Sequence, residues 1–295
     1  MWELFVQPFI DYGFMRRALI GCIAISVGAT PVGVFLILRR MSLTGDAMAH
    51  AILPGAAIGY LISGLSIGAM TIGGMIAGMA VALLSGFATR LTSVREDASL
   101  ASFYLISLAL GVLIVSTRGS NIDLMHVLFG TVLALDDVAL IMLCVIASFS
   151  TLTLACAFRP LVLECADPNF LRSVSRLSAL THFIFLMLVV INLVGGFHAL
   201  GTLMAVGIMI LPAASARFWA LSIGGLILIG VILAVLSSWI GLLLSFHLSL
   251  PSGPAIILVA GIMYVISLAF GSIDGIRTNM LRRSSINIRG KLNEL

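Results

Sequence analysis

The stretch R-R-M-S-L-T-G-D-A-M-A-H-A-I-L-P-G, from Arg39 to Gly55, places an acid and an imidazole one helical turn apart in a strongly apolar chain. Asp46 and His50 stand at i and i+4, so a helix presents both side chains on the same face. Ionisable side chains at bilayer depth are costly, and they mark functional sites by default. A carboxylate beside an imidazole also suits a divalent ion such as zinc, manganese or iron(II). The stretch therefore predicts a polar, metal-compatible site within a membrane protein, with a simple helix cap as the alternative interpretation.

The composition around this stretch is typical of an integral membrane protein. Of the 295 residues, 61% are hydrophobic and only 9% are charged, and the mean hydropathy is +1.21. A soluble domain of this length carries far more charge. The four cysteines are scattered and form no C-x-x-C motif, which argues against both a disulfide framework and a zinc ribbon. The chain has no interleaving of aromatic and basic residues that would indicate nucleic-acid binding.

Apolar runs of about 20 residues, each long enough to cross about 30 Å of hydrocarbon, recur along the chain. They predict an all-α fold, a polytopic membrane helix bundle of about nine (eight to nine) transmembrane helices. An interfacial segment at 1–14 precedes the single membrane domain at 15–272, and a cytoplasmic tail at 273–295 follows it. The expected spans are 15–38, 44–64, 66–90, 98–117, 137–158, 178–196, 198–217, 219–246 and 253–272.

The distribution of basic residues selects an orientation. Nine spans place the termini on opposite sides of the membrane, and basic loops favour the cytoplasm. With the N-terminus outside and the C-terminus inside, only Arg16, Arg17 and Arg118 of the 16 basic residues lie outside. We therefore expect a multi-pass protein of the cell's inner (plasma) membrane in this orientation.

Two prolines interrupt the apolar runs and remove backbone donors. Pro54 leaves the carbonyl of His50 without its helical partner, so this oxygen is a candidate further ligand for a metal or its bound water. Pro212 likewise leaves the carbonyl of Ile208 without its helical hydrogen-bond donor. For Pro212, a broken helix beside a transport path and a kink needed for packing are both open interpretations.

Two segments outside the spans carry further candidate residues. The outer loop holds Asp123 and His126 at i and i+3, which would meet an incoming cation, although a solvated loop is the more ordinary explanation. The inner loop at 159–177 contains Asp167-Pro168, the pattern of a helix start with Asp167 as N-cap and Pro168 at the first position. A short cytoplasmic helix is expected there.

No nucleotide-binding motif occurs in the chain. A P-loop requires a lysine after a glycine-rich turn, whereas the only lysine is Lys291 and no G-x-x-x-x-G-K is present. If ATP drives this protein, another subunit binds it, and the chain itself is not an enzyme. The G-x-S-x-G match around Ser66 falls between two expected spans, so we interpret it as a turn and not as a nucleophile elbow.

Several blocks of sequence together resemble one transporter family. The blocks are R-R-M-S-x-x-G-D-A-x-x-H-A at 39–51 with L-P-G at 53–55, Glu96-Asp97, L-M-H-V-L-F-G-T-V-L at 124–133, D-P-x-F at 167–170, L-P-A-A-S-A-R at 211–217 and P-S-G-P-A at 251–255. Over most of its length the chain is similar to the membrane permeases of ABC importers for zinc and manganese, and in some members iron.

The resemblance implies a homodimeric permease in the lipid bilayer, with a separate cytoplasmic ABC ATPase and an extracytoplasmic metal-binding protein as partners. It implies that Asp46 and His50 lie on the metal path. It also implies that 167–177, with Asp167, Pro168, Phe170 and Arg172, couples the permease to the ATPase. The transported ion would be zinc first and manganese second, with no cofactor bound permanently. The alternative is a self-contained secondary transporter or channel for divalent cations, which would work without an ATPase.

Overall fold

The computed structural model describes residues 5–64, 66–92, 95–117, 132–167, 177–273 and 275–278, and every regular element in these ranges is helical. In chain order the elements are α2 (Gln7–Asp11), α3 (Gly13–Leu38), α4 (Ser42–Ala51), α5 (Leu53–Ser63), α6 (Ile67–Leu91), α7 (Glu96–Thr117), the 3-10 turn η1 (Val132–Ala134), α9 (Asp137–Cys156), α10 (Phe158–Ala166), α12 (Leu177–Leu200), α13 (Thr202–Ala216), α14 (Ile223–Leu248) and α15 (Ser252–Phe270).

Within the described ranges, seven helices are long and apolar enough to cross a membrane, namely α3, α6, α7, α9, α12, α14 and α15. Helices satisfy all backbone polar groups within one segment, which is why long apolar runs in lipid fold this way. The predicted helical membrane bundle is therefore confirmed, whereas the predicted count of nine spans is not. The runs at 44–64 and 198–217 account for the difference.

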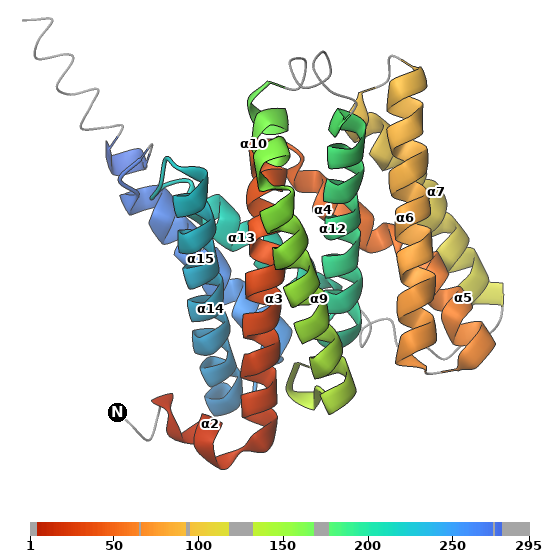
Figure 1. Ribbon diagram of the computed structural model, residues 1–295. Helices are drawn as coiled ribbons and strands as arrows, with labels where there is room; N and C mark the ends of the chain where they lie inside the picture. The colour runs from red at the N-terminus through yellow and green to blue at the C-terminus, as the bar shows by residue number, and fades with distance from the viewer. Residues whose placement is uncertain are drawn as a thin grey trace, which may run out of the picture.

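The run at 44–64 forms two short helices instead of one span. The first, α4, ends at Ala51, and Pro54 stands in the first turn of α5, where a missing N–H costs nothing. Figure 1 shows α4 and α5 following one another obliquely from the upper end of α3 toward the lower end of α6. The run at 198–217 yields α13, an apolar helix of 15 residues, because Gly201 at a φ of 89° ends the preceding helix.

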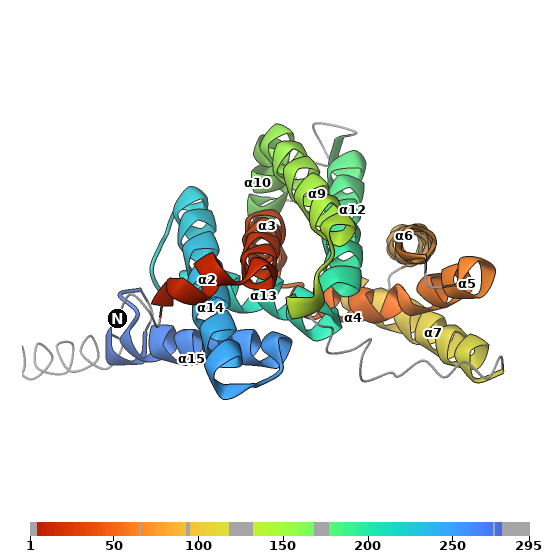
Figure 2. The same cartoon turned by 90° about the horizontal axis from the view of Figure 1, so that it is seen from below.

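The central helix of the bundle is α3, which contacts α9, α13 and α14. Figure 2 shows α14 and α15 on one side of α3, and α6 with α7 on the far side of α12. The path from α3 to α6 is made by α4 and α5, and α4 also contacts α7, α12 and α13. Asp46 and His50 therefore sit on the helix that connects the two halves of the molecule.

Close helix contacts depend on glycine at specific crossings. A Cβ on Gly55 of α5 would lie 2.0 Å from the carbonyl oxygen of Gly73 in α6, and one on Gly59 would lie 2.5 Å from that of Ala69. The G-x-x-x-G pair of α5 therefore packs directly on the α6 backbone.

Pro212 lies inside α13 without breaking it, so the packing interpretation of this proline agrees with the structure. The carbonyl oxygen of Ile208, which loses its helical donor to Pro212, accepts a hydrogen bond of 3.2 Å from the Thr30 hydroxyl of α3. Both Thr30 and Ile208 are fully buried. The α3–α13 contact thus supplies the donor that the proline removes.

Replacing Thr30 with valine, which has the same shape but no hydroxyl, is expected to lower the free energy of unfolding by about 1–3 kcal/mol, because the buried Ile208 carbonyl loses its donor. Thermal unfolding of the purified protein in detergent measures this loss. Thr30→Ser keeps the hydroxyl and serves as the control. A valine variant that melts at the wild-type temperature would show that the hydrogen bond contributes nothing.

Candidate functional site

Asp46 and His50 lie on one face of α4, one turn apart, as their spacing predicts. The His50 Nε2 atom is 3.9 Å from Asp46 Oδ1, which is too long for a hydrogen bond. A metal ion bonded to both atoms at about 2.1 Å would require them to lie somewhat closer together. A small side-chain movement would be enough to bring them there. The two donors are therefore near one another without being locked together, which argues against a purely structural pair.

The imidazole of His50 is held on one side by α7. Its ring stacks on that of Tyr104, with the ring centroids 6.5 Å apart and the planes inclined by 29°. The Nδ1 atom of His50 is buried and has no hydrogen-bond partner among the described residues. Buried polar atoms are normally paired. The Nε2 atom of the same ring faces Asp46, so neither ring nitrogen of His50 is tied up in a hydrogen bond among the described residues. Tyr104 is far from His50 along the chain, so this contact could not be predicted from the sequence.

Asp46 is unusually exposed for an acid within a membrane bundle. Its side chain is 68% accessible in the single chain, whereas its neighbours Thr44, Ala47 and Met48 are buried. The described helices thus leave the α4 face that carries Asp46 uncovered. A carboxylate facing lipid at membrane depth costs about 3 kcal/mol. This face therefore needs water or protein in front of it.

The proline after His50 falls at a break between two helices. The Ile52 N–H is directed at the carbonyl oxygen of His50 from two residues along the chain, and α5 begins immediately afterwards with Pro54 in its first turn. The His50 carbonyl oxygen stays a predicted further ligand. Among the residues that the structure describes, no three His, Cys, Asp or Glu side chains gather closely enough to hold a metal ion.

Most of the other predicted functional residues fall beyond the described ranges. This applies to the outer pair Asp123 and His126, and to Pro168, Phe170 and Arg172 of the coupling segment. Asp167 is described: it ends α10, and its backbone N–H donates to the Leu163 carbonyl at 2.9 Å. Ser66 precedes α6 directly and follows the helix α5, so its G-x-S-x-G match lacks the strand that a nucleophile elbow requires.

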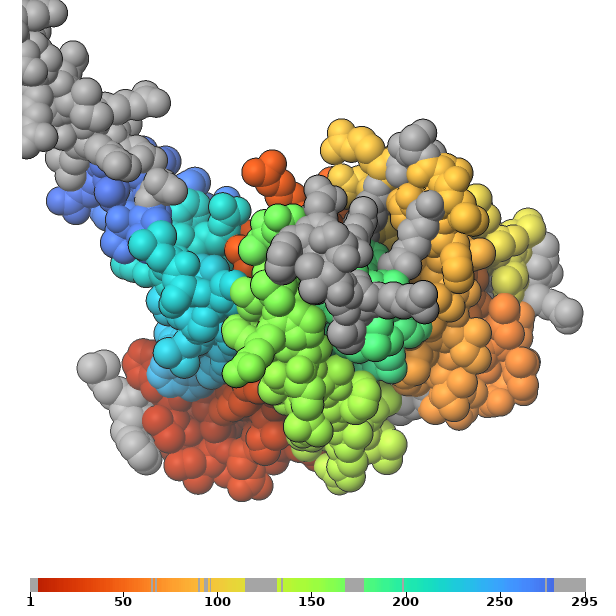
Figure 3. Space-filling model, turned by 45° about the horizontal axis from the view of Figure 1, so that its top comes forward, coloured from red at the N-terminus to blue at the C-terminus, as the bar shows by residue number. Residues whose placement is uncertain are grey.

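One end of the bundle collects the described basic residues. The C-terminal ends of α3, α6, α13 and α15 lie at the same end as α10, which is the upper end in Figure 1 and faces the viewer in Figure 3. The residues at or next to these ends are Arg39, Arg40, Arg90, Arg95, Arg159, Arg217 and Arg277. Only Arg16 and Arg17 of the described arginines lie toward the opposite end, near the start of α3.

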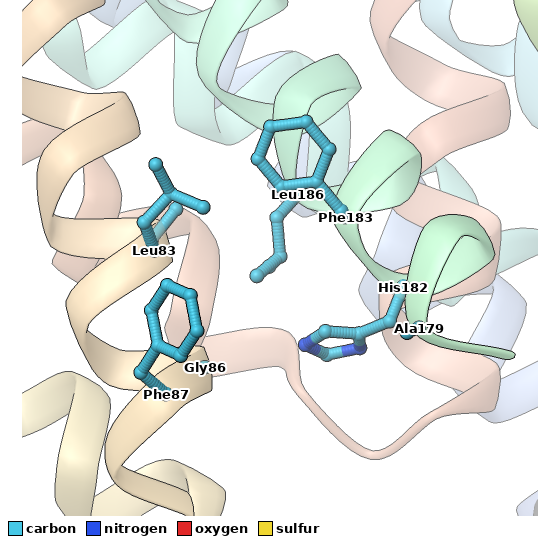
Figure 4. A pocket seen from close by; sticks show the side chains of 8 residues that line it. Leu83, Gly86, Phe87, Ala179, His182, Phe183 and Leu186 are labelled. Atoms are coloured by element: carbon cyan, nitrogen blue, oxygen red, sulfur yellow. The ribbon is translucent and has the colours of Figure 1, made fainter. Parts of the chain in front are cut away.

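A pocket of about 180 Å³ lies between α6 and α12, away from Asp46 and His50. Its walls include Leu83 and Phe87 of α6 with Phe183 and Leu186 of α12, and Figure 4 shows the His182 ring projecting into it. The lining is almost entirely apolar, so it offers no ligand set for a cation.

The chain is similar over most of its length to known transport proteins. The chain is 32% identical over 263 residues to the manganese import system permease protein ScaB of Streptococcus parasanguinis, covering 89% of this chain and 92% of that protein. It is 27% identical over 277 residues to the chelated iron transport system membrane protein YfeD of Yersinia pestis, covering 94% and 92% of the two chains.

A solved structure also matches the fold closely. It is that of PsaBC from Streptococcus pneumoniae in complex with Fab, which has 27% sequence identity and a TM-score of 0.81 and covers 96% of this chain and 100% of that one. The family model of the ABC 3 transport family matches residues 11–271, which is nearly the whole chain. The chain therefore belongs to the ABC 3 transport family, as its sequence blocks suggested.

Proposed function

We propose that this chain is the permease subunit of an ATP-driven importer of divalent metal ions in the inner (plasma) membrane, with Asp46 and His50 on the translocation path. The observation that carries the proposal is the exposed carboxylate of Asp46 beside the imidazole of His50, whose buried Nδ1 atom has no hydrogen-bond partner among the described residues. Both side chains stand on α4, within a strongly apolar bundle. A transport site must bind an ion and then release it. Two side chains are fewer than the three or four ligands of a permanent site, which suits release.

A second copy of the chain completes this path. The Asp46 face of α4 is open in the single chain, and the large apolar residue Leu43 beside it is 83% exposed. Two such faces brought together around a twofold axis would shield the acids from lipid and bring two acid–imidazole pairs to one passage. We therefore propose a homodimer with its axis near α4.

Manganese is the proposed first cargo and zinc the second. The carboxylate and imidazole suit either ion, so the residues alone do not separate them. The ScaB relative is named for manganese import and YfeD for chelated iron transport, and neither is named for zinc. We therefore place manganese before zinc, the reverse of the order expected from the sequence.

ATP hydrolysis is assigned to a separate ATPase at the basic end of the bundle, and cargo delivery to an extracytoplasmic binding protein at the other. The grouping of arginines at the α10 end supports a cytoplasmic position for that end, and hence an external N-terminus and a cytoplasmic C-terminus.

The proposal is tested by manganese uptake into vesicles that contain the chain with or without its ATPase and are supplied with the metal-binding protein. Uptake is expected only when the ATPase and ATP are both present. Uptake driven by a proton or sodium gradient in the absence of the ATPase would instead establish a secondary transporter or channel.

Reversing the charge of Arg172 in the predicted coupling segment is expected to weaken association with the ATPase by about tenfold, because like charges placed across an interface repel. The amount of ATPase that co-purifies with Arg172→Glu measures this. The matched control is Arg17→Glu, a reversal at the opposite end of the bundle that should leave co-purification unchanged. If the two variants recover equal amounts of ATPase, Arg172 is not part of the interface.

A further inference from the structure

A buried ionic cluster joins three helices at the α10 end of the bundle. The Arg39 Nη2 atom of α3 donates to Glu164 Oε2 of α10 at 2.7 Å, and the two side chains are only 8% and 10% exposed. The Arg39 Nη1 atom lies 3.3 Å from Nδ1 of His182 in α12, which must be the acceptor because a guanidinium has no acceptor atom. The guanidinium carbon also sits 4.3 Å from the centre of the Phe185 ring.

Glu164 is the anion that neutralises Arg39 in this cluster. Cys165 lies beside the same guanidinium, but burial raises the pKa of its thiol above the ordinary value of 9.0, against a smaller lowering by Arg39. The thiol therefore stays protonated at neutral pH. One charged partner, held at a short distance and shielded from water, fixes the position of Arg39 relative to α10.

On the α3 side, a short, hydrogen-bonded turn connects Arg39 directly to α4. The Met41 N–H donates to the Leu36 carbonyl at 2.9 Å and the Arg40 N–H to that of Ile37 at 3.0 Å, the hydrogen-bond pattern of a Schellman motif. Arg40 adopts a φ of 61°, a conformation that usually requires glycine and costs an arginine about 1 kcal/mol. Because α4 begins at Ser42, no flexible linker separates Arg39 from the helix of Asp46 and His50.

On the α10 side, Glu164 belongs to the last turn of the helix, and Asp167 ends it. The chain then enters the segment proposed to contact the ATPase. The start of α10 is also held to α3, because the rings of Phe158 and Phe35 meet edge to face with centroids 6.1 Å apart. The helix thus contacts α3 at two points, and its ionic contact lies next to the proposed ATPase segment.

We propose that Arg39 and Glu164 form a positioning pair that transmits movement of α10 to α4, and so links ATP hydrolysis to the metal path. The inference rests on the proposed function. Neither residue touches the ion; they act by fixing where α4 lies. A buried ion pair suits this task because its partners are strongly favoured in one arrangement, whereas an apolar contact tolerates sliding.

The exposed pair Arg17–Asp137 provides a matched comparison. It also joins α3 to a neighbouring helix, α9, with a distance of 3.0 Å, but its side chains are 41% and 76% exposed and it lies at the opposite end of α3. Exposed pairs hold their partners weakly. Loss of this pair should leave transport coupling unchanged.

The test measures manganese transported per ATP hydrolysed by the full complex of permease, ATPase and binding protein in lipid vesicles. Glu164→Gln is expected to lower this ratio by about tenfold or more, within the range of coupling between distant sites, while the ATPase still co-purifies. Arg17→Gln is expected to keep the wild-type ratio. A purely structural role would lower protein abundance and leave the ratio of the surviving complex unchanged, which would overturn the proposal.

A second variant covers the case in which Glu164→Gln does not fold. Replacing both partners by residues of similar volume, Arg39→Met with Glu164→Met, removes the charges together and is expected to fold. Its ratio should fall by about fivefold or more. A ratio within about twofold of wild type in this double variant would overturn the positioning role while leaving the proposed function intact. A wild-type complex that moves neither manganese nor zinc would overturn both.

Discussion

Replacing Asp46 or His50 with alanine is expected to reduce manganese uptake by about 100-fold or more, while the amount of protein in the membrane stays the same. The reason is that each truncation removes one of only two candidate ligands on the path. Asp46 contributes little to packing because its side chain is 68% exposed, whereas His50 is 32% exposed and its truncation removes one ring contact with Tyr104. Uptake of radioactive manganese by cells that lack their own importer, alongside immunoblotting of their membranes, measures both quantities.

The controls are an acid and a histidine at the opposite end of the bundle. Asp137 and His247 are exposed and lie at the first turn of α9 and the last turn of α14. Alanine at either position is expected to change uptake by no more than about twofold. If Asp46→Ala imports manganese as well as Asp137→Ala does, the carboxylate is not part of the path.

Replacing Gly33 with alanine is expected to have the largest effect on stability. A Cβ at this position of α3 would lie 1.7 Å from the carbonyl oxygen of Met209 in α13, which is backbone and has no flexible end to move aside. The helices would have to separate along a contact that also includes the Thr30 hydrogen bond. We expect a loss of about 3 kcal/mol or more in the free energy of unfolding, at the upper end for overpacked sites.

The matched control is Gly261 in the middle of α15, where an added Cβ meets nothing within 4 Å. Gly261→Ala is expected to be neutral or to stabilise the helix by about 0.5–1 kcal/mol. Thermal unfolding in detergent and the yield of folded protein compare the two variants. If the Gly33→Ala and Gly261→Ala proteins unfold at the same temperature, α3 and α13 do not cross as closely as described.

The sequence was sufficient to predict local features. The spacing of Asp46 and His50 requires only that residues 42–51 are helical, and the structure places both side chains on one face of α4. The long apolar runs similarly identify α3, α6, α7, α9, α12, α14 and α15, because length and hydropathy are local properties. Family membership followed from short blocks of sequence spread along the chain.

Features that depend on partners distant in sequence could not be predicted. Tyr104 reaches His50 only because α7 packs against α4. The Arg39–Glu164 pair joins residues 125 positions apart, and nothing in either local sequence indicates the other. The consequences of the prolines were also decided by neighbours: Pro212 is accommodated by Thr30 of another helix, while Pro54 starts a new helix.

The most direct test of the central claim is the chemical accessibility of position 46. In a background without Cys22, Cys144, Cys156 and Cys165, the variant Asp46→Cys is labelled in membranes by a charged, water-soluble thiol reagent or by a lipid-soluble one. We expect rapid labelling by the charged reagent, because the side chain lines an aqueous passage. Labelling by the lipid-soluble reagent alone would place this residue against the bilayer and contradict the account.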